Sequence, residues 1–241
     1  MSNILEIKNF TKIYGGTKIA VDNLSLEVKA GDIYGFIGHN GAGKSTTIKA
    51  VCAVLDFKDG EIFIDGRSIK EDPLYCKQNL AFIPDNPDVY THLTGLQYLN
   101  FIGDIYGIEK IERKELIEKY STIFEIKDNL GDIISSYSHG MKQKLVIISA
   151  LIHRPKLMVM DEPFVGLDPK ATHSMKEIMN EVCDNGGAIF FSTHVLEVAE
   201  KLCNKIAIIK DGKLVVSGNT QDVVGDNSLE ETFLELYNDE K

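Results

Sequence analysis

The hydrophobic positions of this 241-residue chain follow two spacings, which separate predicted strands from predicted helices. Residues 5–10 and 21–28 alternate apolar with polar side chains, as strands buried on one face do. A Tyr-Gly-Gly turn signal lies between them, so we predict an antiparallel pair. Other short runs are almost entirely apolar, which is typical of strands in a parallel sheet covered on both faces. These runs span 33–37, 80–83, 157–160 and 188–192.

Helical spacing follows several of these strands. Ile48, Val51, Cys52 and Leu55 lie at i, i+3, i+4 and i+7, which predicts a helix that begins near Lys44. Strands that alternate with helices form parallel sheets with helices on both faces, so the pattern predicts an α/β fold. The same reasoning predicts helices within 175–182, 195–202 and 228–236, a turn at 59–60, a strand over 61–65, and a hairpin of 206–209 with 214–216.

Residues 93–152 show helical patterns without a predicted strand. We expect two or three helices here, interrupted at Gly107 and Gly131. The last of them, over 141–152, is apolar on most faces and is therefore expected to be buried. This stretch predicts a helical lobe inserted between the strands of the sheet.

The strongest motif runs from Gly38 to Thr46 and fits G-x-x-x-x-G-K-[ST], the phosphate-binding loop. A predicted strand precedes it and a predicted helix follows it, which is the context that the motif requires. Glycines let the backbone approach phosphate oxygens closely, and the helix N-terminus favours negative charge. Lys44 supplies a charge for the β- and γ-phosphates, and the Ser45 hydroxyl could bind Mg²⁺. The predicted nucleotide-binding residues are Gly38, His39, Asn40, Gly41, Ala42, Gly43, Lys44, Ser45 and Thr46.

Polar residues end two other buried strands. Asp161 and Glu162 follow the apolar run 157–160, where Asp161 could hold Mg²⁺ and Glu162 could polarise a water molecule and accept its proton. His194 lies just beyond the run 188–192; it could sense a γ-phosphate or be an ordinary structural histidine. Because the carboxyl ends of parallel strands meet at one edge of a sheet, we expect these groups to converge on the phosphate loop.

Composition narrows the possible partners. The net charge of −10 argues against nucleic acid, whose binders usually carry a basic patch. No apolar run approaches the ~20 residues that span a bilayer, and the first residues lack a secretion signal, so we expect a cytoplasmic protein. The scattered cysteines predict core hydrophobes in a reducing compartment, not a metal site or disulfide: Cys52, Cys76, Cys183 and Cys203.

These motifs, in this order and spacing, resemble the nucleotide-binding subunits of ABC transporters over residues 5–218. The segment 38–46 resembles Walker A and 158–162 resembles Walker B with its catalytic glutamate. Tyr14 resembles the aromatic residue that stacks on adenine, although its local sequence fits a solvent-facing turn equally well. The segment 138–143 resembles the signature motif, although Ser138 alone would be a helix N-cap. Asp168 resembles the D-loop aspartate, and His194 resembles the switch histidine.

The resemblance implies a P-loop NTPase (RecA-like) parallel sheet core with an antiparallel β subdomain and an inserted α-helical subdomain. Residues 1–241 would form one ABC ATPase domain. Its core would comprise 1–92 and 153–220, its helical subdomain 93–152 and its C-terminal helix 221–241. The implied ligands are ATP and Mg²⁺. A second ABC ATPase subunit would pair head to tail, so that one copy's signature residues contact the other's nucleotide: Ser138, His139, Gly140 and Met141.

Two departures from the family pattern stand out. Asp85 occupies the position where most relatives carry glutamine, yet its carboxylate can still bind Mg²⁺, so the predicted metal ligands are Ser45, Asp85 and Asp161. His139 adds bulk and a titratable group to the signature.

The Ser-x-Gly-Met-Lys-Gln form of the signature resembles bacterial exporter ATPases of the ABC-2 type, which work with separate integral membrane permease subunits. It implies a cytoplasmic subunit, peripheral on the inner face of the cell membrane, that docks through residues 86–90 and the helical lobe. The apolar residues of these segments could equally be lobe core. One alternative is a soluble single-cassette ABC-type ATPase that serves a protein-assembly partner. Another is a P-loop kinase, which would not need the signature or Asp168.

Overall fold

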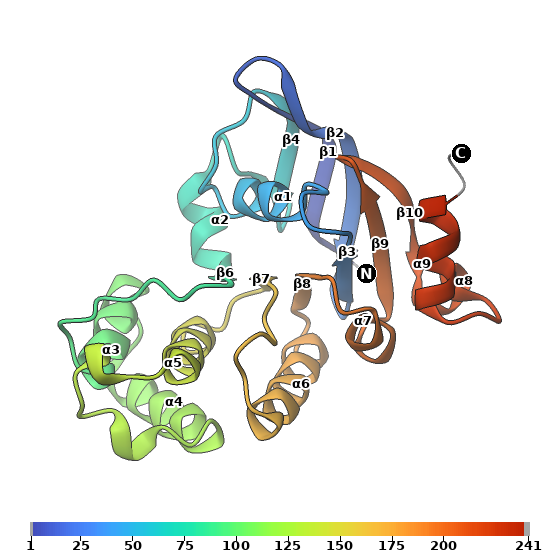
Figure 1. Ribbon diagram of the computed structural model, residues 1–241. Coiled ribbons are helices and arrows are strands. Elements are labelled where there is room, and N and C mark those ends of the chain that lie inside the picture. The colour runs from blue at the N-terminus through green and yellow to red at the C-terminus, as the bar shows by residue number, and fades with distance from the viewer. Residues whose placement is uncertain (1, 239–241) are drawn as a thin grey trace.

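The six-stranded sheet is the centre of the computed structural model, which describes residues 2–238 (Figure 1). Its strand order is β10-β9-β3-β8-β7-β6, with parallel neighbours from β9 to β6 and an antiparallel pair of β9 and β10. The predicted α/β fold with a P-loop NTPase core is confirmed. The strands are β3 (Ile33–Ile37), β6 (Leu80–Ile83), β7 (Leu157–Asp161), β8 (Ala188–Thr193), β9 (Lys205–Lys210) and β10 (Lys213–Asn219).

A second, four-stranded sheet has the order β2-β1-β4-β5. It contains β1 (Asn3–Tyr14), β2 (Lys18–Lys29), β4 (Asp59–Ile64) and β5 (Arg67–Ser68), and β1 pairs antiparallel with both β2 and β4. The predicted antiparallel pair is therefore correct, but the predicted turn at 59–60 is wrong. Asp59 pairs with Thr11 across a register shift, and Gly60 (φ +93°) lies so close to β1 that a Cβ would be 2.6 Å from the Asn9 carbonyl oxygen. Between the Lys8–Glu61 and Thr11–Asp59 pairs the extra residue is on β1, so the glycine of β4 accommodates a bulge in β1.

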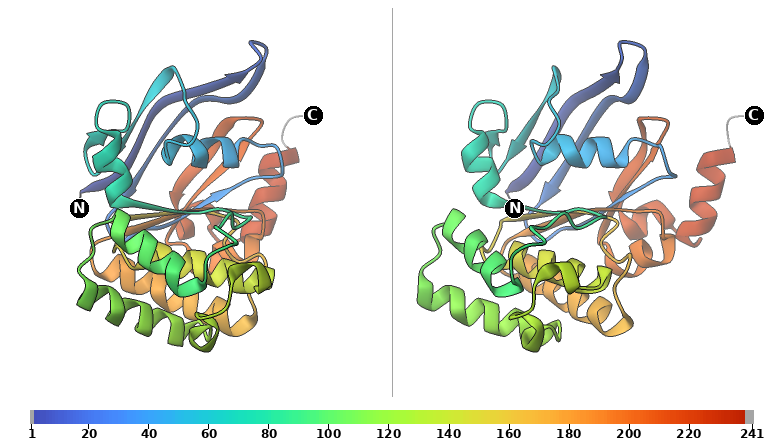
Figure 2. Two further views of the ribbon diagram at one scale, coloured as in Figure 1. Left: turned by 90° about the vertical axis from the view of Figure 1, so that its left-hand side faces the viewer. Right: turned by 60° about the vertical axis from the view of Figure 1, so that its left-hand side comes forward.

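The central strands are apolar throughout because their alternate side chains enter different cores. Met158 and Met160 pack with the helical lobe, whereas Leu157 and Val159 pack with α1 (Lys44–Val51) and the antiparallel sheet. All four are 0% exposed. Figure 2 shows the same arrangement, with the central sheet between the antiparallel sheet and a layer of helices. Burial on both faces is what the continuous apolar runs predicted.

Four helices cover one face of the central sheet: α3 (Gly95–Ile105), α4 (Lys110–Ile123), α5 (His139–Leu151) and α6 (Pro169–Asp184) (Figures 1 and 2). The segment predicted to be helical contains the first three, together with 3₁₀ turns at Lys127–Asn129 and Ile134–Ser136. Near the β9–β10 edge lie α7 (Leu196–Leu202), α8 (Thr220–Val224) and α9 (Leu229–Asn238). Among the described residues, none forms a helix with the length and apolar character needed to cross a membrane.

Helix boundaries follow capping chemistry. The predicted helix over 141–152 begins two residues earlier, because Ser138 Oγ accepts a hydrogen bond from the Met141 N–H (3.2 Å). The predicted capping box of α9 is present between Ser228 and Glu231; residues 239–241 of the predicted terminal segment lie outside the described residues. The short helix α2 (Pro73–Asn79) was not predicted, since seven residues are too few to show a helical repeat.

The four cysteines are free thiols. Cys52, Cys76 and Cys203 are buried, and Cys183 is half-buried. Burial raises the pKa of Cys183 to about 12. They contribute to packing, as the sequence predicted.

Candidate functional site

The phosphate loop joins β3 to α1 with two glycines in left-handed conformations, Gly41 (φ +89°) and Gly43 (φ +108°). A Cβ at Gly43 would lie 2.5 Å from the Ala20 carbonyl oxygen, so the loop rests directly on β2. A Cβ at Gly41 would meet no atom within 4 Å, so the space above the loop is open to a ligand. Gly43 therefore allows the loop to pack closely on β2, and Gly41 leaves its backbone accessible from the cleft. A phosphate-binding loop needs both properties.

Lys44 lies along the inside of this loop. Its Nζ donates to the carbonyl oxygens of Gly38 (2.6 Å) and His39 (3.3 Å), and it is 3.8 Å from Glu162 Oε1. Burial lowers the pKa of Lys44, and the Glu162 and Asp161 carboxylates oppose that shift. The ammonium group is thus held at the loop's mouth, between the backbone and the acidic end of β7.

A cleft of about 490 Å³ opens above the loop. The structure brings together in its walls most of the residues predicted for nucleotide and metal: Tyr14, His39, Asn40, Gly41, Gly43, Lys44, Ser45, Thr46, Asp85, Asp161 and Glu162. Asp211 and Gly212, from the β9–β10 turn, also line it and were not predicted. Gly38 and Ala42 are buried.

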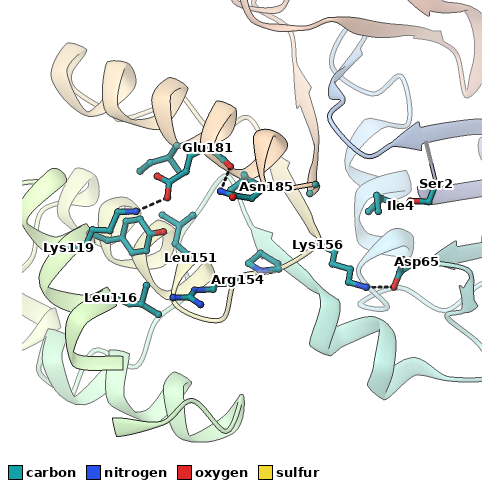
Figure 3. Close-up of a pocket in the computed structure, with 16 residues that line it drawn as sticks. Ser2, Ile4, Asp65, Leu116, Lys119, Leu151, Arg154, Lys156, Glu181 and Asn185 are labelled. Atoms are coloured by element: carbon teal, nitrogen blue, oxygen red, sulfur yellow. Dashed lines mark hydrogen bonds and ion pairs between the residues drawn. The ribbon is translucent and has the colours of Figure 1, made fainter. Parts of the chain in front are cut away.

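A larger cavity of about 570 Å³ lies elsewhere, between α4, α6 and the start of β1 (Figure 3). Its cations are already paired, Lys119 with Glu181 (2.7 Å) and Lys156 with Asp65 (2.6 Å). It contains none of the predicted site residues. We therefore assign the candidate site to the smaller cleft, where the chemically reactive groups converge.

Ser192 of β8 lies beside the carboxyl end of β7 and holds the residues there in place. The Ser192 hydroxyl donates to Asp161 Oδ1 and accepts from the Glu162 N–H (3.1 Å). Glu162 has φ +49°, a conformation that costs about 1–3 kcal/mol for a residue with a side chain. Ser192 therefore helps to hold both acids in place; the only sequence signal for it is a polar residue at the end of an apolar strand.

His194 contacts Glu162 directly, with Nδ1 2.9 Å from Oε1. The His194 side chain is 52% exposed and is not among the residues that line the cleft in the described part of the chain. Its contact with the acid favours the functional interpretation over that of an ordinary structural histidine. An imidazole placed here can orient the Glu162 carboxylate.

Three oxygen-bearing side chains suit a magnesium ion. Ser45 lies in the first turn of α1, Asp161 is 5% exposed, and Asp85 follows β6 with its Oδ1 accepting from the Asn86 N–H (2.8 Å). Hydroxyl and carboxylate oxygens are the ligands that Mg²⁺ prefers, so the donor set fits. Within the described residues no group of three His, Cys, Asp or Glu side chains could hold a metal, so phosphate and water would complete the shell.

Tyr14 lies at the end of β1, on the rim of the cleft, and is 41% exposed. Lys12 Nζ lies 5.4 Å from its ring centroid. A partly exposed aromatic ring at the rim can stack on a flat ring.

The signature segment and the D-loop contact each other, away from the cleft. A Cβ at Gly166 would lie 2.7 Å from His139 Cδ2, and Lys144 Nζ is 2.7 Å from Asp168 Oδ2. Asp168 also caps α6 by accepting from the Ala171 N–H (2.8 Å). The Lys144 ammonium, and then the Ala171 N–H, lower the pKa of Asp168. Ser138, His139, Gly140 and Met141 do not line the cleft of their own chain in the described residues.

The chain is similar to ATP-binding subunits of transporters. A family model described as ABC transporter matches residues 21–165. The chain is 32% identical over 239 residues to the ABC-type transporter ATP-binding protein EcsA of Bacillus subtilis (strain 168), covering 97% of this chain and 96% of that protein. It is 36% identical over 216 residues to the bacitracin transport ATP-binding protein BcrA of Bacillus licheniformis (89% and 69% covered).

The Nod factor export ATP-binding protein I of Cupriavidus metallidurans is 30% identical over 240 residues, covering 100% of this chain and 78% of that protein. A solved structure described as the ATP binding subunit of an ABC transporter matches with a TM-score of 0.93 and 33% identity, covering 97% of this chain and 99% of the other.

Proposed function

The chain belongs to the ABC transporter family as an ATP-binding subunit that hydrolyses ATP, and from this premise we propose that it energises an exporter whose membrane-spanning subunits are separate polypeptides. A relative described as a Nod factor export ATP-binding protein supports the direction of transport, and one described as a bacitracin transport ATP-binding protein supports a role in transport. The subunit would lie at the inner face of the cell membrane, bound to its permease.

One observation carries the proposal. The phosphate loop, Asp161 and Glu162 converge in one open cleft, whereas the signature residues lie on a separate surface of the same chain. Ser138 caps α5, so the N-terminus of α5 is a second potential phosphate-binding surface. Two copies placed head to tail would bring each signature to the other's cleft. The described arrangement thus supports a site that two subunits complete.

Each residue then has a role in ATP hydrolysis. The loop backbone and Lys44 bind the β- and γ-phosphates, and Tyr14 stacks on adenine. Ser45, Asp85 and Asp161 would hold Mg²⁺, which would neutralise phosphate charge. Glu162 orients the attacking water and accepts its proton, while His194 holds the Glu162 carboxylate in place. Nucleotide binding closes the dimer, and hydrolysis reopens it.

We infer that the permease docks on the helical lobe beside β6. Tyr90 (52% exposed) and Phe101 (41% exposed) pack edge to face with ring centroids 5.6 Å apart. Next to them, a cavity of about 520 Å³ is lined by Pro84, Asn86 and residues of α3 and α5. Exposed aromatic rings beside a cavity are typical of protein interfaces. Pro84 and Asn86 of this cavity flank Asp85 of the cleft, so movement of a bound permease would reach a predicted metal ligand through its two chain neighbours.

Co-purification from detergent-solubilised membranes tests this proposal. We expect a membrane-spanning partner to co-purify with the wild-type chain and to be lost from the Tyr90→Ala/Phe101→Ala double variant. Val215→Ala, at an exposed position on β10 at the opposite edge of the sheet, is the matched control and should retain the partner. Recovery of soluble proteins only would favour the protein-assembly alternative. A phosphorylated acceptor formed as ATP is consumed would favour the kinase.

A further inference from the structure

The C-terminal helix α9 contacts the phosphate loop, although the two segments are far apart in the sequence. Its N-terminal end is firmly placed: Leu229 is 0% exposed, and its N–H donates to Glu200 Oε2 (3.0 Å). The ring of Phe233 stacks on Tyr237 with centroids 4.2 Å apart. These contacts fix the direction of the helix, which lies beside β10 and β9 in Figure 1. The last turn of α9 therefore lies against the phosphate loop.

Tyr237 makes two contacts there. Its hydroxyl donates to the Ile209 carbonyl oxygen (2.7 Å), the same oxygen that lies 2.5 Å from where a Cβ of Gly38 would be. Its ring meets the His39 imidazole edge to face, with centroids 5.4 Å apart and planes at 76°. Gly38 and His39 are the first residues of the phosphate loop. Tyr237 therefore supports the loop at its junction with β3.

Neighbouring groups hold Tyr237 in this position. Lys210 Nζ donates to the Tyr237 carbonyl oxygen (3.2 Å) and lies 5.2 Å from its ring centroid. Asp211 Oδ1 is 3.6 Å from His39 Nε2 on the side of the cleft. Burial raises the pKa of Tyr237, so its hydroxyl keeps its proton and remains a donor at neutral pH. Tyr237 therefore has partners on β9, on the phosphate loop and on α9 itself.

We propose that Tyr237 is a positioning residue for nucleotide binding: through Ile209 and His39 it holds the first residues of the phosphate loop in the conformation that accepts phosphate. It touches neither the open cleft nor the predicted metal ligands. A loop that is held in its binding conformation binds the nucleotide more tightly, because it loses less conformational entropy on binding. The inference rests on the proposal that this loop holds the nucleotide.

The test compares Tyr237→Phe, which keeps the ring and removes the hydroxyl, with Tyr237→Leu, which removes both contacts. Binding of a non-hydrolysable ATP analogue with Mg²⁺ is measured by calorimetry on the full chain. We expect Tyr237→Phe to weaken binding about two- to tenfold, the effect of one ordinary hydrogen bond, and Tyr237→Leu to weaken it further. In steady-state assays KM for ATP should rise while kcat stays unchanged. In a His39→Ala background, the loss caused by Tyr237→Leu should shrink, because one of the contacts is already absent.

Two control variants distinguish failure of this inference from failure of the proposed nucleotide site. Leu234→Ala changes a 53% exposed position of the same helix and should bind as the wild type does. Lys44→Ala should lose affinity through the loop itself. Wild-type affinity in both Tyr237 variants, with Lys44→Ala impaired, would overturn the inference and leave the proposed site standing. Equal weakening by Leu234→Ala would also overturn it, because the effect would then belong to the whole helix. Wild-type affinity in Lys44→Ala would overturn the site as well.

Discussion

The phosphate loop and the signature segment differ in how much of their surroundings one chain supplies. The loop is enclosed by β2, the β9–β10 turn and the acidic end of β7, so Lys44 and Asp161 are nearly buried. The signature segment meets the D-loop on one side, through the His139–Gly166 contact and the adjoining Lys144–Asp168 ion pair, while Ser138 and His139 are exposed. The first region can bind a ligand by itself. Under the proposed head-to-tail pairing, the second region acts on the nucleotide of another copy, and its contact with the D-loop joins it to α6.

The sharpest way to separate binding from turnover is Glu162→Gln. We expect ATP binding to remain, while hydrolysis falls about a hundredfold or more, because a general base is lost without loss of shape. The uncleaved nucleotide should also accumulate closed dimers, measured by size-exclusion chromatography with ATP and Mg²⁺. Unchanged turnover would refute the role given to Glu162.

Lys44→Ala tests the enclosed region directly. Loss of a charge-assisted contact to phosphate should weaken nucleotide binding about ten- to a hundredfold, as measured by equilibrium binding. The melting temperature without nucleotide reports whether the fold is intact. Affinity at the wild-type level would count against the assignment of the loop.

Lys144→Met tests the link between the two regions. Removing the ion pair to Asp168 should leave the nucleotide affinity of a single chain unchanged and reduce turnover about two- to fivefold, since partly exposed pairs are weak. Lys119→Met is the matched control, because it breaks another 2.7 Å ion pair to α6, that with Glu181 near the C-terminal end of the helix. Equal effects of both variants would show that the D-loop contact has no special role.

The smallest expected effect concerns His153, which stacks on Tyr106 (3.8 Å between centroids) and joins the helical lobe to β6. Burial lowers the pKa of His153, and the backbone carbonyl groups of Leu80 and Ser149 only partly offset this. The unfolded chain therefore binds a proton more readily than the folded one, so stability should fall as the pH drops below about 6.5. Urea denaturation between pH 5.5 and 7.5 should show a shallower pH dependence for His153→Gln than for the wild type. Parallel curves would contradict this.

Much of the cleft could be predicted because its chemistry is carried by short segments. The glycine pattern of 38–46, its flanking strand and helix, and the acids after 157–160 are all local signals. The rule that parallel strands end at one edge was enough to bring Lys44, Asp161 and Glu162 together. Residues that act through distant contacts were missed. Ser192, Lys144, Asp211 and Tyr237 show no motif, and each becomes informative only beside its partner.

The prediction of a turn at Asp59-Gly60 failed for a related reason. An Asp-Gly pair favours a tight turn locally, but here β1 lies close enough to continue the sheet, and Gly60 tolerates the bulge. Pairing with a neighbouring strand outweighed the local preference. The predicted roles of Ser138 and Asp85 stay predictions, because they depend on a second subunit and on bound magnesium.

By itself, the amino-acid sequence determined the α/β class, the phosphate loop and the residue types of the reaction, because periodicity and glycine spacing act over a few neighbouring residues. Only the tertiary structure decided that Ser192 holds the Glu162 backbone, that His139 meets Gly166, and that the final helix supports the loop through Tyr237. Those contacts join segments widely separated in the chain, and the packing of two cores on one sheet selects them.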